Sequence, residues 1–391
     1  MRIGLICLVL AYVLSQFYRA FLAVLAPALQ RDIGATPDDL ALASGVWFLC
    51  FALMQIPVGA ALDRFGPRFT AVAMFALGAG GGSALFALAQ SPMHLTLAMA
   101  LIGIGCSPVL MAAYYIFARS FSPAVFGTLA AAMIGVGSLG NIAGSAPLAW
   151  TVEALGWRAT MGGLGAISLL IGAALWISLQ DPARTETART ETAQRGSVLD
   201  VLRQRALWPV FAMMFVCYAP AAGLRALWVG PYTADVYGVD VQVIGQVTLV
   251  MGLAMVAGNF AYGPLDRIFR TRKWVNFIGN LGVVAACGAL WFWPAPGLWT
   301  SAALLAMAGF CGASFGMVMA HGRAFVPAHL TGRGVSLLNL FGIAGAGIAQ
   351  LVTGRLHATS GDAPYGAIFL YFGLTTLIGL GVYLFSRDRT D

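Results

Sequence analysis

The chain has 391 residues, of which 60% are hydrophobic and only 9% charged, with a formal net charge of +7 and a mean hydropathy of +0.83. These values lie far outside the range of soluble globular domains and indicate a polytopic membrane protein. The basic residues fall in short loops rather than in one patch, so membrane orientation explains them and no nucleic-acid partner is expected. The six cysteines lie inside apolar stretches without paired spacing, which predicts neither disulfides nor a zinc site.

Apolar segments long enough to span a bilayer, about 20 residues each, follow one another along the whole chain. In order they cover residues 3–29, 39–62, 69–89, 93–118, 124–152, 159–180, 206–232, 243–263, 274–294, 298–321, 333–356 and 364–386. The predicted fold is therefore an all-α membrane protein of twelve transmembrane helices. The first apolar run is expected to be an uncleaved span, because polar residues interrupt it and no small-residue cleavage site precedes the next loop. Thr36-Pro37-Asp38-Asp39 predicts a helix cap opening the second span.

The distribution of basic residues over the loops predicts the orientation. Assigning alternate loops to opposite faces puts seventeen arginines and lysines on one face and three on the other. The positive-inside rule then predicts that both termini are cytoplasmic, in a multi-pass protein of the cytoplasmic (inner) membrane. The one long polar stretch, residues 181–205 with its repeated Ala-Arg-Thr-Glu-Thr, is interpreted as a disordered linker between two halves, 1–180 and 206–391.

A short charged loop occurs twice. Its first copy contains Asp63 and Arg64 between two apolar runs, and its second contains Asp266 and Arg267. Each copy has an acidic residue 31 positions upstream, at Asp32 and Asp235. Such repetition indicates two halves built on one plan, as in transporters with parallel repeats.

The first copy of this loop has the pattern Gly-x-x-x-Asp-Arg-x-Gly-x-Arg, filled by Gly59, Asp63, Arg64, Gly66 and Arg68. It resembles the loop signature of the major facilitator superfamily. Gly59 is expected to let helices approach closely, and Gly66 to permit a tight turn. The resemblance implies two pseudo-symmetric six-helix halves, alternating access, and cytoplasmic gate latches at Asp63/Arg64 and Asp266/Arg267. The second copy differs, with Tyr262 in the place of Gly59.

Two arginines lie inside predicted spans, where a central arginine costs about 2.5–3.5 kcal/mol on insertion scales and is rarely kept without a role. Arg19 lies in the first span and Arg225 in the seventh, each seven positions after a tyrosine, Tyr12 and Tyr218. The spacing from Arg19 to Pro27 resembles the first span of organophosphate:phosphate exchangers, in which arginines of the first and seventh helices hold the anion. This resemblance implies that Arg19 and Arg225 form an anion clamp.

The sequence places no carboxylate inside a span to neutralise these arginines, and guanidinium groups suit carboxylate, phosphate or nitrate-like anions. A small organic anion is therefore the expected substrate. Further candidate binding residues are Gln16, Tyr114, Asn141 and His321, in addition to Tyr12 and Tyr218. A structural alternative exists for Arg225, which could extend to the membrane interface together with Trp228 and Tyr232. His321 could instead be held at the interface.

Two other transport functions also fit parts of the sequence. The pair Met251 and Met255 places two sulfurs on one helical face, which suits Cu(I), although methionine also fills irregular packing. A Cu(I) importer and a multidrug exporter therefore stay open as alternatives. No catalytic triad, metalloprotease or nucleotide-binding motif is found, so neither an enzyme nor a cofactor is expected. The protein is expected to act as a monomer in the lipid bilayer.

Glycine clusters predict the packing of the helices. They occur at Gly78–Gly82, Gly103 and Gly105, Gly135–Gly144 and Gly342–Gly347. In lipid, small residues let helices pack backbone to backbone, so these clusters are expected to mark close crossings.

Overall fold

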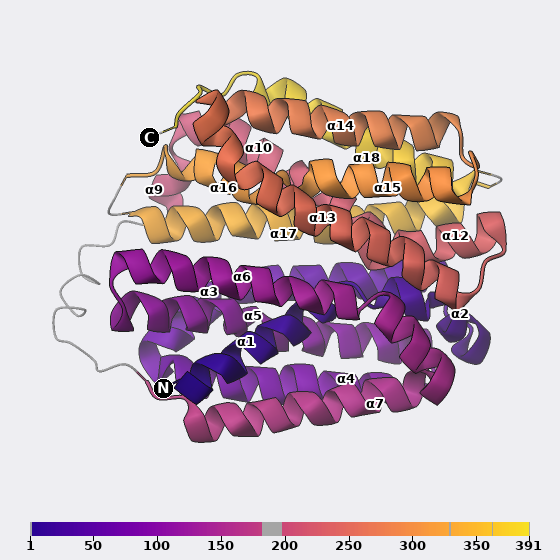
Figure 1. Cartoon of the computed structure of the whole chain (residues 1–391), viewed down its shortest axis with the longest axis horizontal. Coiled ribbons are helices and arrows are strands. Elements are labelled where there is room, and N and C mark those ends of the chain that lie inside the picture. The colour runs from indigo at the N-terminus through magenta and orange to yellow at the C-terminus, as the bar shows by residue number, and fades with distance from the viewer. Residues whose placement is uncertain (1, 182–197, 328–329, 362, 391) are drawn as a thin grey trace. The chain divides into compact units, whose positions relative to one another are not determined.

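The structure is a computed structural model that describes residues 2–181, 198–327, 330–361 and 363–390 (Figure 1). Within these ranges every regular element is a helix and no strand forms. Most of the predicted linker, residues 182–197, lies outside the described residues. The all-helical composition confirms the predicted fold class.

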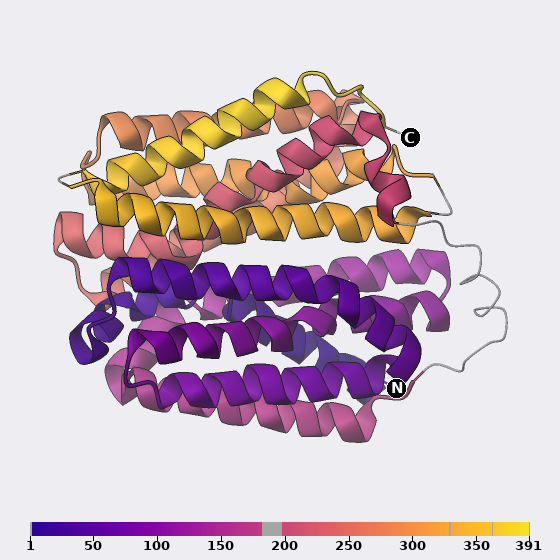
Figure 2. The same cartoon turned by 180° about the vertical axis from the view of Figure 1, so that it is seen from behind.

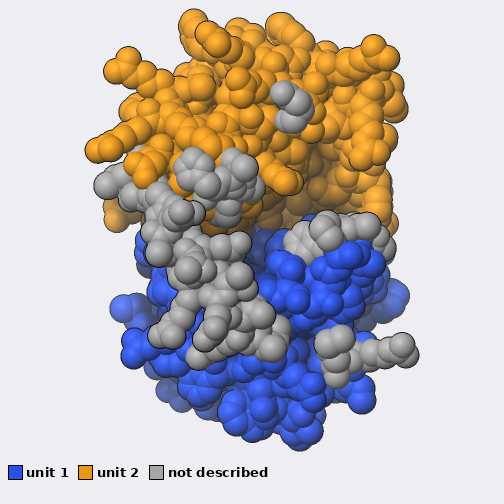
Figure 3. Space-filling model, turned by 90° about the vertical axis from the view of Figure 1, so that its left-hand side faces the viewer, with its two compact units in different colours: residues 1–182, 226–249 blue, residues 183–225, 250–391 orange. Residues whose placement is uncertain are grey.

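The chain divides into two compact units, coloured separately in Figure 3. Unit 1 contains Met1–Pro182 and Ala226–Leu249, and unit 2 contains Ala183–Arg225 and Val250–Asp391. The segment Ala226–Leu249, which the sequence analysis assigned to the C-terminal half, thus clusters with unit 1. The division into two six-helix halves stays a prediction.

The first part of the chain contains seven α-helices and a π-helical turn among its described residues. They are α1 (Arg2–Phe17), α2 (Leu22–Ile33), α3 (Pro37–Met74), η1 (Phe75–Gly80), α4 (Gly81–Ala87), α5 (Pro92–Ser120), α6 (Pro123–Ala143) and α7 (Ala146–Ser178). The predicted cap at the start of α3 is confirmed. The Thr36 hydroxyl accepts a hydrogen bond from the Asp39 backbone N–H at 3.2 Å, and the Asp39 carboxylate accepts one from the Thr36 backbone N–H at 3.0 Å.

The second part of the chain begins with a short helix and a span made of several pieces. Its elements are α9 (Val198–Leu202), η2 (Arg205–Leu207), α10 (Trp208–Cys217), α11 (Ala219–Gly223), η3 (Leu224–Trp228), α12 (Val229–Tyr237), α13 (Val241–Phe269), α14 (Lys273–Phe292), α15 (Leu298–Cys311), η4 (Gly312–Ser314), α16 (Phe315–Arg323), α17 (Thr331–Thr359) and α18 (Pro364–Tyr383). The boundary between the units falls within η3 and again within α13.

Nine helical runs of the described residues are long and apolar enough to cross a membrane, and the bent pair α1 and α2 makes a tenth. The run Pro37–Ala87 has 51 residues, enough for two spans, and it is broken at Gly66; the folding back of the chain after α3 can be followed in Figure 2. A similar break at Gly156 divides α7. Among the described residues, these long and broken runs are in rough agreement with the twelve predicted spans. Both breaks have positive φ, 84° at Gly66 and 78° at Gly156, which glycine adopts without strain.

Close crossings occur where glycines cluster, as predicted. A Cβ atom at Gly105 of α5 would lie 2.2 Å from the backbone nitrogen of Ala79, and one at Gly140 of α6 would lie 1.8 Å from the carbonyl oxygen of Val13 in α1. Only glycine lets the backbones meet at these distances. The outer surfaces are apolar instead: Leu77 is 75% exposed and Ile177 is 81% exposed, as expected for side chains that face lipid.

Candidate substrate-binding site and gate

The first span is broken at Arg19. Helix α1 ends at Phe17, α2 begins at Leu22, and the two helices are bent by 56°. Residues 18–20 form a turn in which the Arg19 backbone N–H reaches only the Gln16 carbonyl, at 3.4 Å. The sequence had predicted one continuous span with Arg19 near its middle. Discontinuous helices of this kind are typical of the substrate sites of transporters, because the break frees backbone polar groups inside the membrane.

The guanidinium group of Arg19 lies against aromatic rings. Its central carbon is 4.7 Å from the ring centroid of Phe51 and 5.5 Å from that of Trp47, both on α3. Its Nε is buried without a hydrogen-bond partner, and no carboxylate of the described residues forms an ion pair with it. Cation–π contacts offset part of the cost of desolvating a cation but leave its hydrogen-bond donors available. The arrangement therefore favours an anionic ligand.

The other predicted binding residues of unit 1 gather around Tyr12 of α1, the helix that ends just before Arg19. The Gln16 side-chain amide donates a hydrogen bond to the Tyr12 hydroxyl at 3.1 Å. Tyr114 of α5 lies near Tyr12. Asn141 lies one turn beyond Gly137, whose Cβ would be 2.4 Å from the Tyr12 ring, so this face of α6 packs on α1. Helices α1, α5 and α6 thus present a polar cluster along one side of the broken span.

In unit 2, Arg225 lies in the π-helical turn η3, which follows the short helix α11. The second arginine therefore also occupies an irregular part of its span, and single π-helical turns are frequent at functional sites. Arg225 is only 3% exposed, and Trp228 is 1% exposed. Tyr232, which with Trp228 belongs to the interface alternative for Arg225, is 1% exposed, so all three side chains are enclosed by other parts of the protein.

The guanidinium group of Arg225 is closely packed by neighbouring helices of unit 2. A Cβ atom at Gly252 of α13 would lie 3.1 Å from the Arg225 Nε, so a glycine makes room for the guanidinium group. Tyr218 lies near Arg225, and its ring packs on that of Phe315 with centroids 5.1 Å apart. The repeated pair of tyrosine and arginine thus forms a local cluster in unit 2.

His321 does not take part in such a cluster. It is fully buried, its Nε2 donates to the Arg387 carbonyl oxygen at 2.9 Å, and its Nδ1 accepts from the Tyr383 hydroxyl at 2.5 Å. Asn276 also donates to the Tyr383 hydroxyl, at 3.2 Å. With both ring nitrogens engaged in hydrogen bonds, His321 joins α16 to the end of α18.

The methionine pair has a packing role. A Cβ atom at Gly309 of α15 would lie 3.0 Å from Met255 and 3.2 Å from Met251, so both side chains fill the space over this glycine. Met251 is fully buried. Among the described residues, no group of three His, Cys, Asp or Glu side chains could hold a metal ion. The Cu(I) alternative therefore gains no support from the two methionines.

The charged loop of unit 1, residues 59–68, contacts residues outside its own sequence motif. Asp63 lies 3.9 Å from Arg119 at the end of α5, and the Arg119 guanidinium packs over the Tyr115 ring at 3.9 Å. Arg64 packs instead over Phe65, at 5.2 Å. Gly59 was expected to permit a close helix approach, but a Cβ there would meet only Met111, at 4.0 Å. That expectation is wrong, since ordinary van der Waals contact would result.

Arg68 and the turn at Gly66 are tied to the end of α7. The Arg68 backbone N–H donates to the Asp181 carboxylate at 2.8 Å, and its Nε donates to the Trp176 carbonyl oxygen at 2.8 Å. A Cβ atom at Gly66 would lie 2.8 Å from the Asp181 carboxylate. The tight turn predicted for Gly66 is confirmed, and the same glycine also admits this carboxylate.

Unit 2 repeats this arrangement with different partners. Asp266 forms an ion pair with Arg272 at 3.1 Å rather than with Arg267. Tyr262, in the position of Gly59, donates to the Cys311 carbonyl oxygen at 2.8 Å and thereby joins α13 to α15. The Asp388 carboxylate accepts hydrogen bonds from the backbone N–H groups of Arg272 and Lys273 at 3.1 and 3.0 Å.

Asp181 and Asp388 are thus equivalent carboxylates that the sequence reasoning missed. Asp181 is the first acidic residue after α7 and Asp388 the first after α18, and each accepts hydrogen bonds from backbone N–H groups beside a charged loop. Carboxylates placed at free N–H groups act as helix caps. Their position after the last span of each half is the signal that could have identified them.

Asp388 gives a testable pH dependence. Partial burial raises the pKa of its carboxyl, but hydrogen bonds from the Thr271 hydroxyl and the two backbone N–H groups outweigh this, so the pKa lies below its ordinary value of 3.8. Because this pKa is lower in the folded than in the unfolded protein, the ionised Asp388 carboxylate stabilises the fold above about pH 3.8. That contribution to stability is lost as the pH falls through the pKa of the folded protein. We expect Asp388→Asn to lower the melting temperature by a few degrees at pH 7, since a cap contributes about 1 kcal/mol.

Thermal unfolding of the purified protein between pH 3 and pH 7 measures this effect. The difference between wild type and Asp388→Asn should shrink below about pH 3.8. The matched control is Asp200→Asn, because Asp200 forms an exposed ion pair with Arg203 at 3.9 Å that contributes little. A difference between wild type and Asp388→Asn that stays constant down to pH 3 would contradict the role given to this carboxylate.

Comparisons with known proteins place this arrangement in a family. The family model described as Major Facilitator Superfamily matches residues 8–228 and 224–391. Among solved structures, a bacterial homolog of the human lysosomal transporter Spinster, inward-facing and occupied, has a TM-score of 0.75 at 19% identity and covers 97% of this chain and 95% of its own. A D-xylose-proton symporter has a TM-score of 0.77 at 14% identity, covering 98% of this chain and 97% of its own. These likenesses concern the fold.

Relatives with related sequences cover most of the chain. The uncharacterized transporter YybO of Bacillus subtilis is 25% identical over 95% of this chain and 91% of its own length. The galacturonate transporter of Dickeya chrysanthemi is 25% identical over 71% of this chain and 85% of its own. The probable sulfoacetate transporter of Cupriavidus necator is 26% identical over 72% of this chain and 70% of its own length. The family match spans both units, and with it the chain is identified as a member of the major facilitator superfamily, a multi-pass membrane transporter and not an enzyme.

Proposed function

We propose that the protein is a secondary active transporter that moves a small organic anion across the inner membrane by alternating access. The observation that carries this proposal is Arg19, a cation at a break in the first span, whose contacts are two aromatic rings and no described carboxylate. The similarity to transporters named for galacturonate and sulfoacetate, both organic anions, supports the same substrate class.

Arg19 and Arg225 are the two residues expected to bind the charged group of the anion. A planar guanidinium matches carboxylate or sulfonate oxygens with two parallel hydrogen bonds. The hydroxyl and amide groups of Tyr12, Gln16, Tyr114, Asn141 and Tyr218 bind the rest of the substrate. His321 is not included, because both of its ring nitrogens are engaged in hydrogen bonds.

The charged loops act as gate latches at the cytoplasmic ends of the two units. Asp63 with Arg119 and Asp266 with Arg272 are the ion pairs that hold each loop. The latter pair is largely buried, with side chains 16% and 17% exposed, so it is less screened by solvent than a surface pair. The excess of basic residues on this face orients both termini to the cytoplasm.

A counterflow assay in proteoliposomes tests the substrate class independently of the direction of transport. Vesicles loaded with one unlabelled compound are diluted into its labelled form, and galacturonate and sulfoacetate are compared with galactose. We expect exchange of at least one anion and none of galactose, which has the size of galacturonate but lacks its charge. Exchange of galactose at the same rate as galacturonate would refute an anion-specific site.

A further inference from the structure

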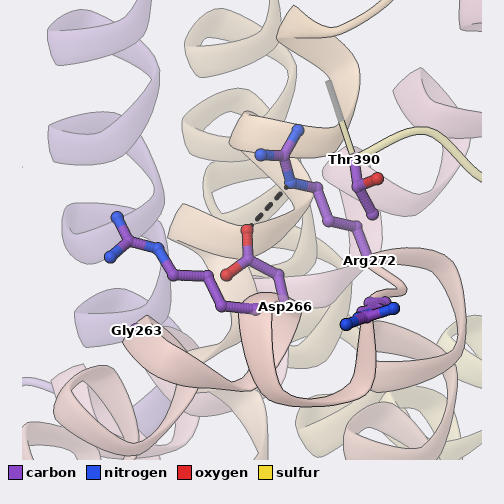
Figure 4. Close-up of a pocket in the computed structure, with 6 residues that line it drawn as sticks. Gly263, Asp266, Arg272 and Thr390 are labelled. Atoms are coloured by element: carbon purple, nitrogen blue, oxygen red, sulfur yellow. Dashed lines mark hydrogen bonds and ion pairs between the residues drawn. The ribbon is translucent and has the colours of Figure 1, made fainter.

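A basic pocket lies at the turn between α13 and α14 in unit 2, away from the span that carries Arg225. Its volume is about 410 Å³, and it is lined by Gly263, Asp266, Arg267, Arg270, Arg272 and Thr390. In Figure 4, Asp266 and Arg272 are joined by their ion pair, with Thr390 beside Arg272. We call this set of residues the basic pocket.

The residues that line the basic pocket carry an excess of positive charge. They include three guanidinium groups and one carboxylate, a net charge of +2 for the lining. Asp266 and Arg272 neutralise each other at 3.1 Å, and Arg272 also donates to the Ala320 carbonyl oxygen at 3.4 Å. Among the described residues, neither Arg267 nor Arg270 forms an ion pair. Two exposed guanidinium groups are therefore available to an outside anion.

The backbone around the basic pocket is fixed from both sides. Arg270 has φ of 53° and is the one non-glycine residue of the described chain with positive φ, a conformation that such residues rarely adopt. The C-terminal tail, which contributes Thr390, is tied down by Asp388 and by Lys273, whose Nζ donates to the carbonyl oxygens of Leu384 and Ser386 at 2.6 and 2.8 Å. The backbone on both sides of the pocket is thus held by specific hydrogen bonds. The Lys273 ammonium group already donates to two carbonyl oxygens and is not counted among the groups that bind a ligand.

Exposed apolar side chains adjoin the basic pocket. Ile268 and Phe269, between the two available arginines, are 66% and 63% exposed, and Trp274 at the start of α14 is 48% exposed. A free phosphate ion would bind the guanidinium groups but would make no favourable contact with this apolar surface. A phospholipid uses both, because its phosphate binds the arginines while its acyl chains cover the apolar side chains.

We propose that the basic pocket binds the phosphate of an anionic phospholipid from the adjacent leaflet. Arg267 and Arg270 donate to the phosphate oxygens, and Arg272 holds Asp266 so that its carboxylate does not repel the headgroup. Binding of this lipid ties the loop after α13 to the membrane surface. The site does not depend on the substrate proposed above, because it uses neither Arg19 nor Arg225.

Native mass spectrometry of the delipidated, detergent-purified protein tests the proposal with three probes: phosphatidylglycerol, zwitterionic phosphatidylcholine and inorganic phosphate. The variant Arg267→Gln with Arg270→Gln removes two charges from the pocket. Its matched control is Arg203→Gln with Arg205→Gln, two exposed arginines of unit 2 outside the pocket. We expect one phosphatidylglycerol to bind wild type more tightly than phosphatidylcholine, and the pocket variant to lose affinity about tenfold or more.

The control variant should keep the affinity of wild type. If the double variant does not yield a monodisperse protein, Thr390→Glu places a carboxylate in the pocket without removing an arginine and should also weaken phosphatidylglycerol. Equal binding of phosphatidylglycerol to wild type and to whichever pocket variant folds would overturn the proposal. Displacement of phosphatidylglycerol by inorganic phosphate at similar concentrations would also overturn it, since the site would then recognise a free ion.

Discussion

Replacing Arg19 by alanine is expected to reduce anion counterflow at least about 100-fold while the protein stays folded. Arg19 is partly buried, with its Nε fully buried. Removing one partner of a desolvated charge pair costs about 2–5 kcal/mol, and 2.7 kcal/mol corresponds to a factor of about 100. Stability should be preserved, because the Arg19 side chain makes no ion pair with a described residue. Its removal relieves the cost of burying a cation, which exceeds the lost contacts with Trp47 and Phe51.

The control for this prediction is Arg31→Ala. The Arg31 side chain is 76% exposed and pairs with Asp32 at 3.0 Å, so its loss should leave counterflow nearly unchanged. Arg19→Lys should retain part of the activity, because lysine keeps the charge but cannot form two parallel hydrogen bonds. If Arg19→Ala lowers the melting temperature and leaves the counterflow of the folded fraction intact, Arg19 has a structural role instead.

The second large effect is expected at Gly140, where α6 crosses α1. A Cβ atom there would lie 1.8 Å from the Val13 carbonyl oxygen and 2.9 Å from the Phe17 backbone nitrogen. Both are backbone atoms, so no change of side-chain rotamer relieves the overlap and the two helices must separate. We expect Gly140→Ala to destabilise the protein by about 3 kcal/mol, at the upper end of overpacking effects, and to lower its melting temperature accordingly.

Gly135 provides the matched control on the same helix. No atom lies within 4 Å of a Cβ built there, so Gly135→Ala should be neutral or slightly stabilising, since alanine favours a helix by about 0.5–1 kcal/mol over glycine. Thermal unfolding of the two purified variants, followed by size-exclusion chromatography, gives the comparison. Equal melting temperatures for the two variants would show that α1 and α6 do not pack as closely as described.

The sequence predicted those parts of the fold that depend on local signals. The length of each apolar run predicted the spans, the cap at Thr36 predicted the start of α3, and Gly66 predicted a turn. Each of these follows from a few neighbouring residues, so the distant parts of the chain do not alter the outcome. The close crossing at Gly140 was predicted for a similar reason, because a run of glycines on one helical face has few other uses in a membrane.

The irregular turns at Arg19 and Arg225 could not be predicted from composition. Both arginines lie in runs that are, as a whole, apolar enough to span a membrane, so overall hydropathy marks neither the break between α1 and α2 nor η3. The partners of the charged loops were missed because they are distant in the chain. Asp63 pairs with Arg119 rather than with its neighbour Arg64, and that choice depends on how the helices pack.

Equilibrium binding of the labelled anion selected by the counterflow assay tests the central claim most directly. Purified wild type and Arg19→Gln are compared in detergent, where no gate movement or driving force intervenes. We predict saturable binding to wild type and a loss of affinity of at least about 100-fold in Arg19→Gln, whose melting temperature should match that of wild type. The same dissociation constant for both proteins would contradict an anion site at Arg19.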